Sequence, residues 1–446
     1  MFKIPARESA VVWRLFAYSL TIATSYFVAR TVGDSLFLSR IGNDQLALTF
    51  VIAGCCTAVI AGAWYFATRH ISVSKSIQIS GVAFALLSLA AWALLPSYHH
   101  SYKLLAAIYL LAEVKGVINT INVVSVLNTK LGRDASKPAW AAIGVAAPLA
   151  AVVAGGFFSL EHGLLSLRYW LLFGAVLDVA SCLIGFVMAK TPAIGKTIDG
   201  EPKPRTSSLS HLREDSGSFK LAQKVKKVYV SSSKFRFWIG VLFAAKVIAL
   251  TIVAFEWKSS VNLFYKGDEV QMLRFFGIYY GAVGLATIGL QLFLTSSLLV
   301  QRNIALPILL MPVLLLGVAF SFVAGASLIV VFSAATFGKS LDAWRRSVHD
   351  TTLNLLYTKI KRKERRGTIS LSSGVIKPLS EVVASSVILF GAAAIYRPLF
   401  FLALLIWILS AAQLIRLVGK THPTPAKTAG PKEETVDVSD SGMVLE

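Results

Sequence analysis

Ionisable side chains are concentrated in one apolar stretch of this sequence, residues 327–357. They are Lys339, Asp342, Arg345, Arg346, His349 and Asp350. All but Arg345 follow the spacing i, i+3, i+7, i+10 and i+11, which places them along one face of a helix. A charge in hydrocarbon costs about 2.5–3.5 kcal/mol even on insertion scales, so this face must contact a cavity or partner helices. We expect Lys339 and Asp342 in a cavity, whereas the end near Asp350 fits either a cavity or cytoplasmic ion pairs.

Charges also lie in the apolar stretches 103–128 and 237–263. Glu113 and Lys115 are two residues apart and point to different sides of a helix, and Glu113 is the better candidate for a cavity. Lys246 lies well inside its stretch. Glu256 and Lys258 lie nearer its outer end, where they fit either a cavity or side chains that extend to the membrane interface.

Three further stretches contribute charged residues. Arg30 and Asp34 are four residues apart, as are Lys377 and Glu381, so each pair can form an ion pair on one helix. For Arg30 and Asp34 a structural and a functional pair are both consistent with the sequence. Asp178 is alone in its stretch and could pair with any of these cations.

Two roles are predicted from these residue types. Cations in a cavity bind anionic substrate groups through charge-assisted hydrogen bonds. Carboxylates there act as counter-charges or carry a coupling proton. The candidates for substrate binding are Lys115, Lys246, Lys339 and Arg346, and the candidate carboxylates are Asp34, Glu113, Glu256, Asp342, Asp350 and Glu381.

Motifs of enzymes are missing from the sequence. It contains no G-x-x-x-x-G-K-[ST] phosphate loop, no H-E-x-x-H and no G-x-S-x-G. We therefore expect no enzymatic activity, no cofactor and no metal site. Primary pumping driven by nucleotide hydrolysis is also disfavoured, which leaves a secondary transporter or facilitator.

The composition shows which elements must position these charges. Of 446 residues, 55% are hydrophobic and 15% are charged, whereas a soluble domain is about 45–50% apolar and about 25% charged. This excludes a soluble enzyme, a disordered chain and a disulfide scaffold. Each membrane-spanning helix needs about 20 mostly apolar residues. Twelve apolar stretches qualify, at about 11–37, 45–68, 76–96, 103–128, 137–159, 168–189, 237–263, 273–298, 304–323, 327–357, 370–394 and 398–418.

The twelve stretches predict an all-α membrane protein with two pseudo-symmetric six-helix halves, as in major facilitator transporters. The expected parts are an N-terminal half at 1–189, a cytoplasmic linker at 190–236, a C-terminal half at 237–418 and a disordered cytoplasmic tail at 419–446. The net charge of +21 lies mostly in the loops predicted to be cytoplasmic, which places both termini in the cytoplasm. We take this charge as a topology signal and expect no nucleic-acid partner.

An internal repeat supports the two halves. Gly144-Val145-x-x-Pro148-Leu149-x-x-Val152-Val153-Ala154 matches the segment that begins at Gly374 in seven of eleven positions. The same offset of 229 to 230 residues places Glu113 opposite Asp342. We therefore expect these two carboxylates at equivalent positions on either side of one cavity.

Short segments resemble the nucleotide transporter family, the ADP/ATP translocases of plastids and obligate intracellular bacteria. Thr31-Val32-Gly33-Asp34-Ser35-Leu36 is similar to that family's Lys-Asp-Thr-Leu segment at the end of helix 1. Similar matches are Ala112-Glu113 with Asn128 and Gly144, Glu256-Trp257-Lys258, and Ser347-Val348-His349-Asp350-Thr351-Thr352. The resemblance implies a major-facilitator-like fold and acidic positions at Glu113 and Glu256.

The departures concern the substrate. The family's helix 1 lysine falls on Gly33, and its helix 10 Lys-Glu pair falls on Leu353-Asn354. Because such lysines are expected to bind nucleotide phosphates, their absence argues against ATP/ADP exchange.

We therefore expect a monomeric secondary transporter in a bacterial inner membrane. It would move an anionic or zwitterionic metabolite by alternating access, with nucleotide-related compounds among the candidate substrates and a proton as the candidate coupling ion. Two alternatives stay open: a proton-coupled exporter of amphipathic compounds such as a drug or siderophore, and a non-transporting scaffold or receptor whose basic loops bind anionic lipid.

Overall fold

The predicted apolar stretches form long helices in the computed structural model. The structure describes residues 6–68, 70–130, 142–160, 166–189, 233–294, 305–324, 327–358, 360, 364, 368, 371–391 and 393–419, and within these it contains helices and turns but no strand. Helices dominate because backbone groups in lipid must be hydrogen-bonded within their own segment.

Within the described residues, the first half is formed by six helices. They are α1 (Ala6–Arg40), α2 (Leu46–Thr68), α3 (Val73–Leu94), α4 (Tyr102–Lys130), α6 (Ala146–Ser159) and α7 (Leu167–Ala189). The second half begins with α8 (Ser233–Phe264), α9 (Glu269–Gly289) with its π-helical extension η2 (Leu290–Leu294), and α11 (Ala305–Val323). It continues with α12 (Leu328–Ser340), α13 (Asp342–Trp344), η3 (Arg345–His349), α14 (Asp350–Thr358), η4 (Ser372–Ile376), α16 (Lys377–Phe390) and α17 (Ala393–Gly419).

Ten helices in the described segments are long and apolar enough to span a membrane. The two other predicted stretches, 327–357 and 370–394, contain shorter helices: the π-helical turn η3 separates α13 from α14 in the first, and the π-helical turn η4 directly precedes α16 in the second. Such turns occur often at functional sites. Most of the predicted linker and tail lies outside the described residues, so the domain boundaries stay a prediction.

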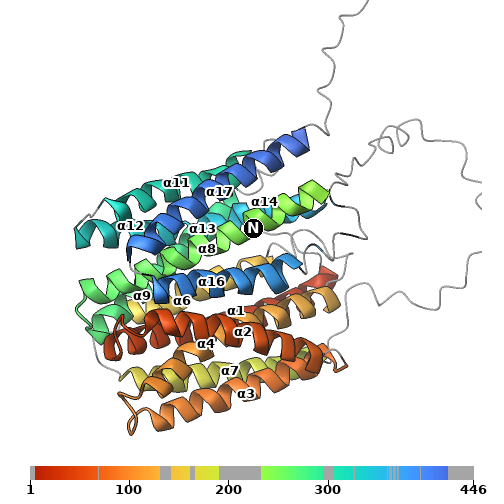
Figure 1. Ribbon diagram of the computed structural model, residues 1–446. Coiled ribbons are helices and arrows are strands. Elements are labelled where there is room, and N and C mark those ends of the chain that lie inside the picture. Colours follow the sequence, from red (N-terminus) through yellow and green to blue (C-terminus); the bar gives the residue numbers. More distant parts are fainter. Residues whose placement is uncertain are drawn as a thin grey trace, which may run out of the picture.

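The helices run roughly parallel to one another in a single bundle (Figure 1). Helices α3 and α7 pack together at one edge, and α11, α12 and α17 lie at the other. The halves meet in the centre, where α6 packs on α9, α2 packs on α16, and α1 contacts α8 and α9. The charged faces of α1, α4, α8 and η3 therefore lie in the interior of the bundle.

Helices α6 and α9 approach each other most closely at glycines. A Cβ atom on Gly155 would lie 2.5 Å from the carbonyl oxygen of Gly277 and 2.7 Å from the Cα atom of Gly281. Small residues allow helix backbones in a membrane to come this close. This contact makes α6 and α9 a tight seam between the two halves.

Candidate functional site

A central cavity of about 1100 Å³ lies between the two halves. The first half lines it with α1, α2 and α4, and the second half with α8, α16 and the segment from α12 to α14. It extends from the middle of the bundle to Ser125 and Tyr357, which lie near the ends of α4 and α14. In the predicted topology these are the cytoplasmic ends of both helices.

Seven of the ten predicted site residues line this cavity. They are Glu113, Lys246, Lys339, Asp342, Arg346, Asp350 and Glu381. Three cations that were not among the predicted site residues, Arg30, Arg345 and Lys377, also line it. The two carboxylates paired by the internal repeat, Glu113 and Asp342, thus both face the same cavity from opposite halves.

A network of charges covers the wall formed by the second half. Asp342 accepts a hydrogen bond from Lys339 Nζ at 2.8 Å and another from Arg345 Nε at 2.8 Å. Asp350 lies 2.9 Å from Lys246 Nζ and 3.3 Å from Arg345 Nη1. Each of these carboxylates is thus shared by two cations.

The π turn η3 changes which side chains face the cavity. A regular helix would place His349 on the same face as Asp342 and Arg346, but His349 is fully buried, with its ring edge-on to Trp407 at 5.3 Å between centroids. Arg345, which regular spacing places off that face, lines the cavity instead. The expected five-residue face is wrong here because a π turn contains more residues per turn than an α-helix and shifts the register.

Arg346 differs from the other cavity cations. Its side chain is exposed although the residue lies in the middle of a predicted span, because the side chain lines the cavity. Within the described residues no carboxylate lies within ion-pair distance of its guanidinium group, whereas Arg30, Lys246, Lys339, Arg345 and Lys377 each have one. Its donors are therefore free for a bound anion.

The wall formed by the first half is more aromatic. Tyr26, Phe50 and Tyr109 line it, and charge is limited there to Arg30 and Glu113. Arg30 forms an ion pair with Glu113 and donates from Nε to Asp34 at 3.1 Å. Arg30 thus connects the cavity to a second group of charges deeper in the bundle.

That second group closes the end of the bundle opposite the cavity mouth. Asp34 from α1 pairs with Lys258 from α8 at 2.7 Å, and both side chains are almost completely buried. Lys258 also donates to the Tyr109 hydroxyl at 2.7 Å. Lys258 therefore does not extend to the membrane interface, and Asp34 is the counter-charge of a lysine in the other half and does not line the cavity.

A second bridge between the halves lies further along the same end. Arg40, the last residue of α1, contacts Glu269 at the start of α9 through Nε at 2.9 Å and Nη2 at 3.1 Å. Asn43 donates to the Ser259 carbonyl at 3.3 Å. In the part of the chain that the structure describes, the cavity is thus closed at this end and open towards the predicted cytoplasmic side.

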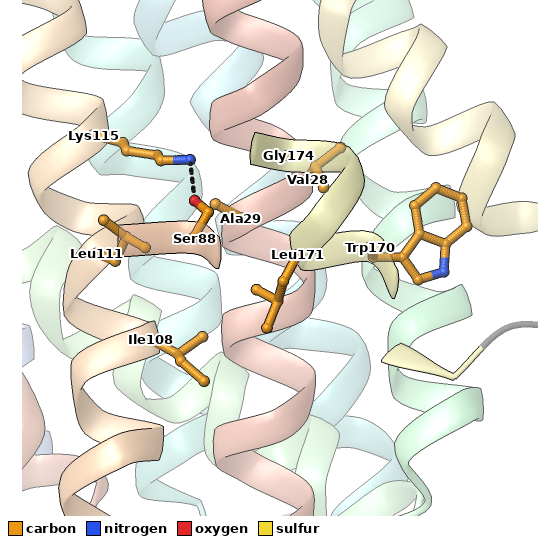
Figure 2. Close-up of a pocket in the computed structure, with 9 residues that line it drawn as sticks. All are labelled: Val28, Ala29, Ser88, Ile108, Leu111, Lys115, Trp170, Leu171 and Gly174. Carbon is orange, nitrogen blue, oxygen red and sulfur yellow. Dashed lines mark hydrogen bonds between the residues drawn. The ribbon is translucent and has the colours of Figure 1, made fainter. Parts of the chain in front are cut away.

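Lys115 does not lie in the central cavity. It points into a small pocket of about 10 Å³ inside the first half, where Figure 2 shows it reaching Ser88. Its Nζ donates to Asp178 at 2.6 Å, Ser88 at 3.1 Å and Ser25 at 3.2 Å. These partners come from α7, α3 and α1, so this structure corrects the predicted role of Lys115 from substrate binding to internal pairing with Asp178.

Glu256 is also paired away from the cavity. It accepts a hydrogen bond from Arg397 Nε at 2.9 Å, and Arg397 Nη1 donates to the Phe322 carbonyl at 2.9 Å. This ties α8 to α17 and α11 within the second half. The predicted cavity role of Glu256 is therefore replaced by a structural contact in this conformation.

Comparisons with known proteins give the fold. No protein-family model matches this sequence, and no curated protein matches it. Among solved structures, the inward-open xylose transporter XylE from E. coli aligns with a TM-score of 0.58 at 13% identity, over 94% of this chain and 97% of that one. The fold is major facilitator-like.

Two other solved structures align over similar lengths. The POT family transporter PepTSo has a TM-score of 0.58 at 12% identity, over 92% of this chain and 98% of its own. The nucleoside transporter NupG, solved as a point mutant, has a TM-score of 0.51 at 13% identity, over 92% of this chain and 100% of its own. The predicted fold class is confirmed, whereas the narrower resemblance to ADP/ATP translocases stays a prediction.

Proposed function

We propose that this protein is a secondary transporter that moves an anionic small molecule by alternating access. The observation that carries the proposal is the charge balance of the central cavity. Six Lys and Arg side chains line it against four Asp and Glu side chains, and Arg346 has no carboxylate partner among the described residues. A cavity with surplus cations favours an anion as its occupant.

The arrangement of the halves supports alternating access. Contacts between charged side chains of the two halves, Asp34 with Lys258 and Arg40 with Glu269, lie at one end, and the cavity extends towards the other. Breaking these contacts and closing the opposite end would expose the same cavity to the other side of the membrane. The fold neighbours are transporters by name, which agrees with this proposal.

The coupling ion in this proposal is a proton, and Glu381 is its carrier. Asp342 and Asp350 each accept a bond of 2.9 Å or less from a cation, whereas Lys377 Nζ lies 3.7 Å from Glu381. Glu381 also lines the cavity and is partly exposed. A loosely paired carboxylate loses less interaction energy when it takes up a proton.

Two positions bear on a nucleotide as the substrate. A side chain at position 33 would face the α4 backbone near Ile108 and Tyr109, so it would not extend into the cavity. Leu353 does line the cavity but is apolar. We therefore propose an organic anion smaller or less charged than ATP, with exchange of ATP for ADP weak or absent.

Uptake into proteoliposomes tests the proposal. Purified protein is screened with labelled anionic, zwitterionic, neutral and cationic metabolites, with and without an inward-directed proton gradient. We expect uptake of an anion that the gradient stimulates and that falls in Arg346→Gln. Arg168→Gln is the matched control, because Arg168 stacks on Tyr169 outside the cavity.

Three results would contradict the proposal. Uptake of only neutral or cationic amphipathic compounds would favour the exporter alternative. Absence of uptake by folded protein for every class would favour a scaffold or receptor. Stimulation by the proton gradient that survives in Glu381→Gln would remove Glu381 as the proton carrier.

A further inference from the structure

Two polar groups without partners face the central cavity from opposite halves. Arg346 comes from η3 in the second half, and Tyr26 comes from α1 in the first. Within the described residues the Tyr26 hydroxyl has no hydrogen-bond partner, although the hydroxyl groups of nearby Tyr109 and Tyr280 are both engaged. Both side chains line the same cavity, Tyr26 on the wall formed by the first half and Arg346 on the wall formed by the second.

The two groups have complementary chemistry for one kind of ligand. A guanidinium group offers only donors, in a planar fork that matches the oxygens of a carboxylate or phosphate. A tyrosine hydroxyl can donate one further hydrogen bond to the same oxygens. Arg345 also lines this cavity, but Asp342 and Asp350 already accept its hydrogen bonds.

The place of the Tyr26 ring depends on Gly116 of α4. A Cβ atom at position 116 would lie 2.8 Å from Tyr26 Cε2 and 3.4 Å from Cδ2. The shorter of these distances is less than two non-bonded carbon atoms tolerate, so any larger residue at position 116 would displace the Tyr26 ring. Glu113, one turn earlier on α4, pairs with Arg30, one turn after Tyr26 on α1, which fixes the two helices beside each other.

We propose that an oxyanion group of the substrate binds between Arg346 and Tyr26, and that Gly116 is the positioning residue for Tyr26. This inference rests on the proposed function, since it specifies the group by which the cavity recognises its anion. The bound oxyanion connects the two halves directly at a point where the empty protein has no contact between these two side chains. Substrate binding thereby stabilises one arrangement of the halves relative to the other.

Thermal unfolding of the purified protein in detergent tests the site without transport. The probes are inorganic phosphate and sodium acetate, each titrated at constant ionic strength against sodium chloride. We expect the melting temperature to rise with one or both probes but not with chloride. A rise with phosphate alone identifies a phosphate-type group, and a rise with acetate identifies a carboxylate.

The variants separate the three residues. Arg346→Gln should raise the half-saturating probe concentration about 10- to 100-fold, because a charge-assisted bond is lost. Tyr26→Phe should raise it about 2- to 10-fold, because one neutral hydrogen bond is lost. Gly116→Ala should have an effect of the same size as Tyr26→Phe, whereas Gly62→Ala is the control, since no atom lies within 4 Å of a Cβ at position 62.

A double-mutant cycle distinguishes positioning from a general packing effect. If Gly116→Ala acts only by displacing Tyr26, it should add nothing in the Tyr26→Phe background. Additive effects would overturn the positioning role of Gly116. An unchanged response in Tyr26→Phe would overturn the two-sided site.

Failure of the inference and failure of the proposed function give different results. If neither probe shifts the wild-type melting temperature while an anion is transported in liposomes, the site between Arg346 and Tyr26 is wrong and anion transport stands. If an oxyanion binds but no class of metabolite is transported, the site stands and the proposed transport fails.

Discussion

The charges inside the first half and those around the central cavity are paired in different ways. Inside the first half, Lys115 and Asp178 lie 2.6 Å apart, exposed by 0% and 4%, and Ser25 and Ser88 complete their hydrogen bonds. Around the cavity, Asp342 and Asp350 are each shared between two cations, and Arg346 is exposed without a carboxylate partner among the described residues. In the first arrangement the charged groups are paired with each other within the protein, whereas the second leaves the hydrogen-bond donors of Arg346 for a ligand.

This difference separates two uses of charge in a membrane protein. A buried pair whose bonds are all made within the protein connects helices, and it leaves nothing to bind a ligand. A charged side chain without a counter-ion is tolerated in a membrane span only where water or a ligand can reach it. Burial and pairing together therefore distinguish a structural charge from a candidate site better than depth in the sequence does.

The largest effect is expected from breaking the closed pair. Asp178→Asn leaves the Lys115 ammonium group buried without a counter-ion, and loss of one partner of a buried pair costs about 3–5 kcal/mol. We expect a large fall in melting temperature in detergent and in the yield of folded protein. The double variant Lys115→Met/Asp178→Leu, which removes both charges, should recover most of the stability.

A wild-type melting temperature in Asp178→Asn would show that the pair is not structural. Failure of the double variant to recover would show that the hydrogen bonds of Ser25 and Ser88, rather than the charges, are what matter there.

The next effect compares two neighbouring arginines of the cavity. Arg346→Gln removes donors that no described carboxylate uses, so uptake should fall about 10- to 100-fold with an unchanged melting temperature. Arg345→Gln deprives Asp342 and Asp350 of a partner, so it should lower both uptake and melting temperature. Equal losses of stability in the two variants would contradict the distinction between free and paired cations.

A smaller effect is expected at the two carboxylates that the repeat makes equivalent. Glu113→Gln and Asp342→Asn preserve size and remove charge, and we expect each to reduce uptake about tenfold per folded molecule, near 1.4 kcal/mol. The structure adds a difference between them. Asp342 neutralises two cations and is 8% exposed, whereas Glu113 is 29% exposed.

Asp342→Asn should therefore also lower the melting temperature, and Glu113→Gln should do so much less. Uptake per folded molecule and thermal unfolding, measured on the same preparations, check both statements. Full activity in both variants would remove these carboxylates from the site.

Much of the architecture could be predicted because lipid imposes simple rules. The apolar stretches predicted where the helices lie. The internal repeat predicted that Glu113 and Asp342 lie at one cavity, and both line it. Seven of the ten predicted residues line the cavity, because an ionisable group in a span must face something polar. These are properties of single helices and of symmetry, which a sequence contains.

Whether each of the remaining predicted residues reaches the cavity depends on how its helix is rotated and packed against its neighbours. Whether Lys115 faces the cavity or Asp178 is set by the orientation of α4 against α7, and no spacing in the sequence gives that angle. Because of the π turn at Arg345–His349, Arg345 lines the cavity in place of His349. The segment contains no proline or glycine from which this turn could be predicted. Arg397, the partner of Glu256, was missed because it lies just before the last predicted apolar stretch.

The smallest effect is expected at the closed end, where the contacts between the halves also differ in burial. Asp34 and Lys258 are 1% and 0% exposed, whereas Arg40 and Glu269 are 21% and 25% exposed. An ion pair that water reaches contributes about 0–1 kcal/mol, which corresponds to a shift in population of at most about fivefold. Glu269→Gln should thus favour the outward-open arrangement only slightly.

The measurement uses a single cysteine at Thr57, which lines the cavity, in a background where Cys55, Cys56 and Cys182 are serine. A membrane-impermeant maleimide added outside intact cells should label it slowly while the Arg40 end is closed. Glu269→Gln should raise that rate by up to about fivefold and leave labelling from the inside of inverted vesicles nearly unchanged. Arg274→Gln, on the same helix but outside the cavity lining, is the control.

Fast labelling from outside without any substitution would mean that the Arg40 end faces the cytoplasm, and the predicted orientation would be reversed. An unchanged rate in Glu269→Gln would assign closure to the buried Asp34–Lys258 pair alone, because a contact that contributes nothing to the population cannot be part of the gate.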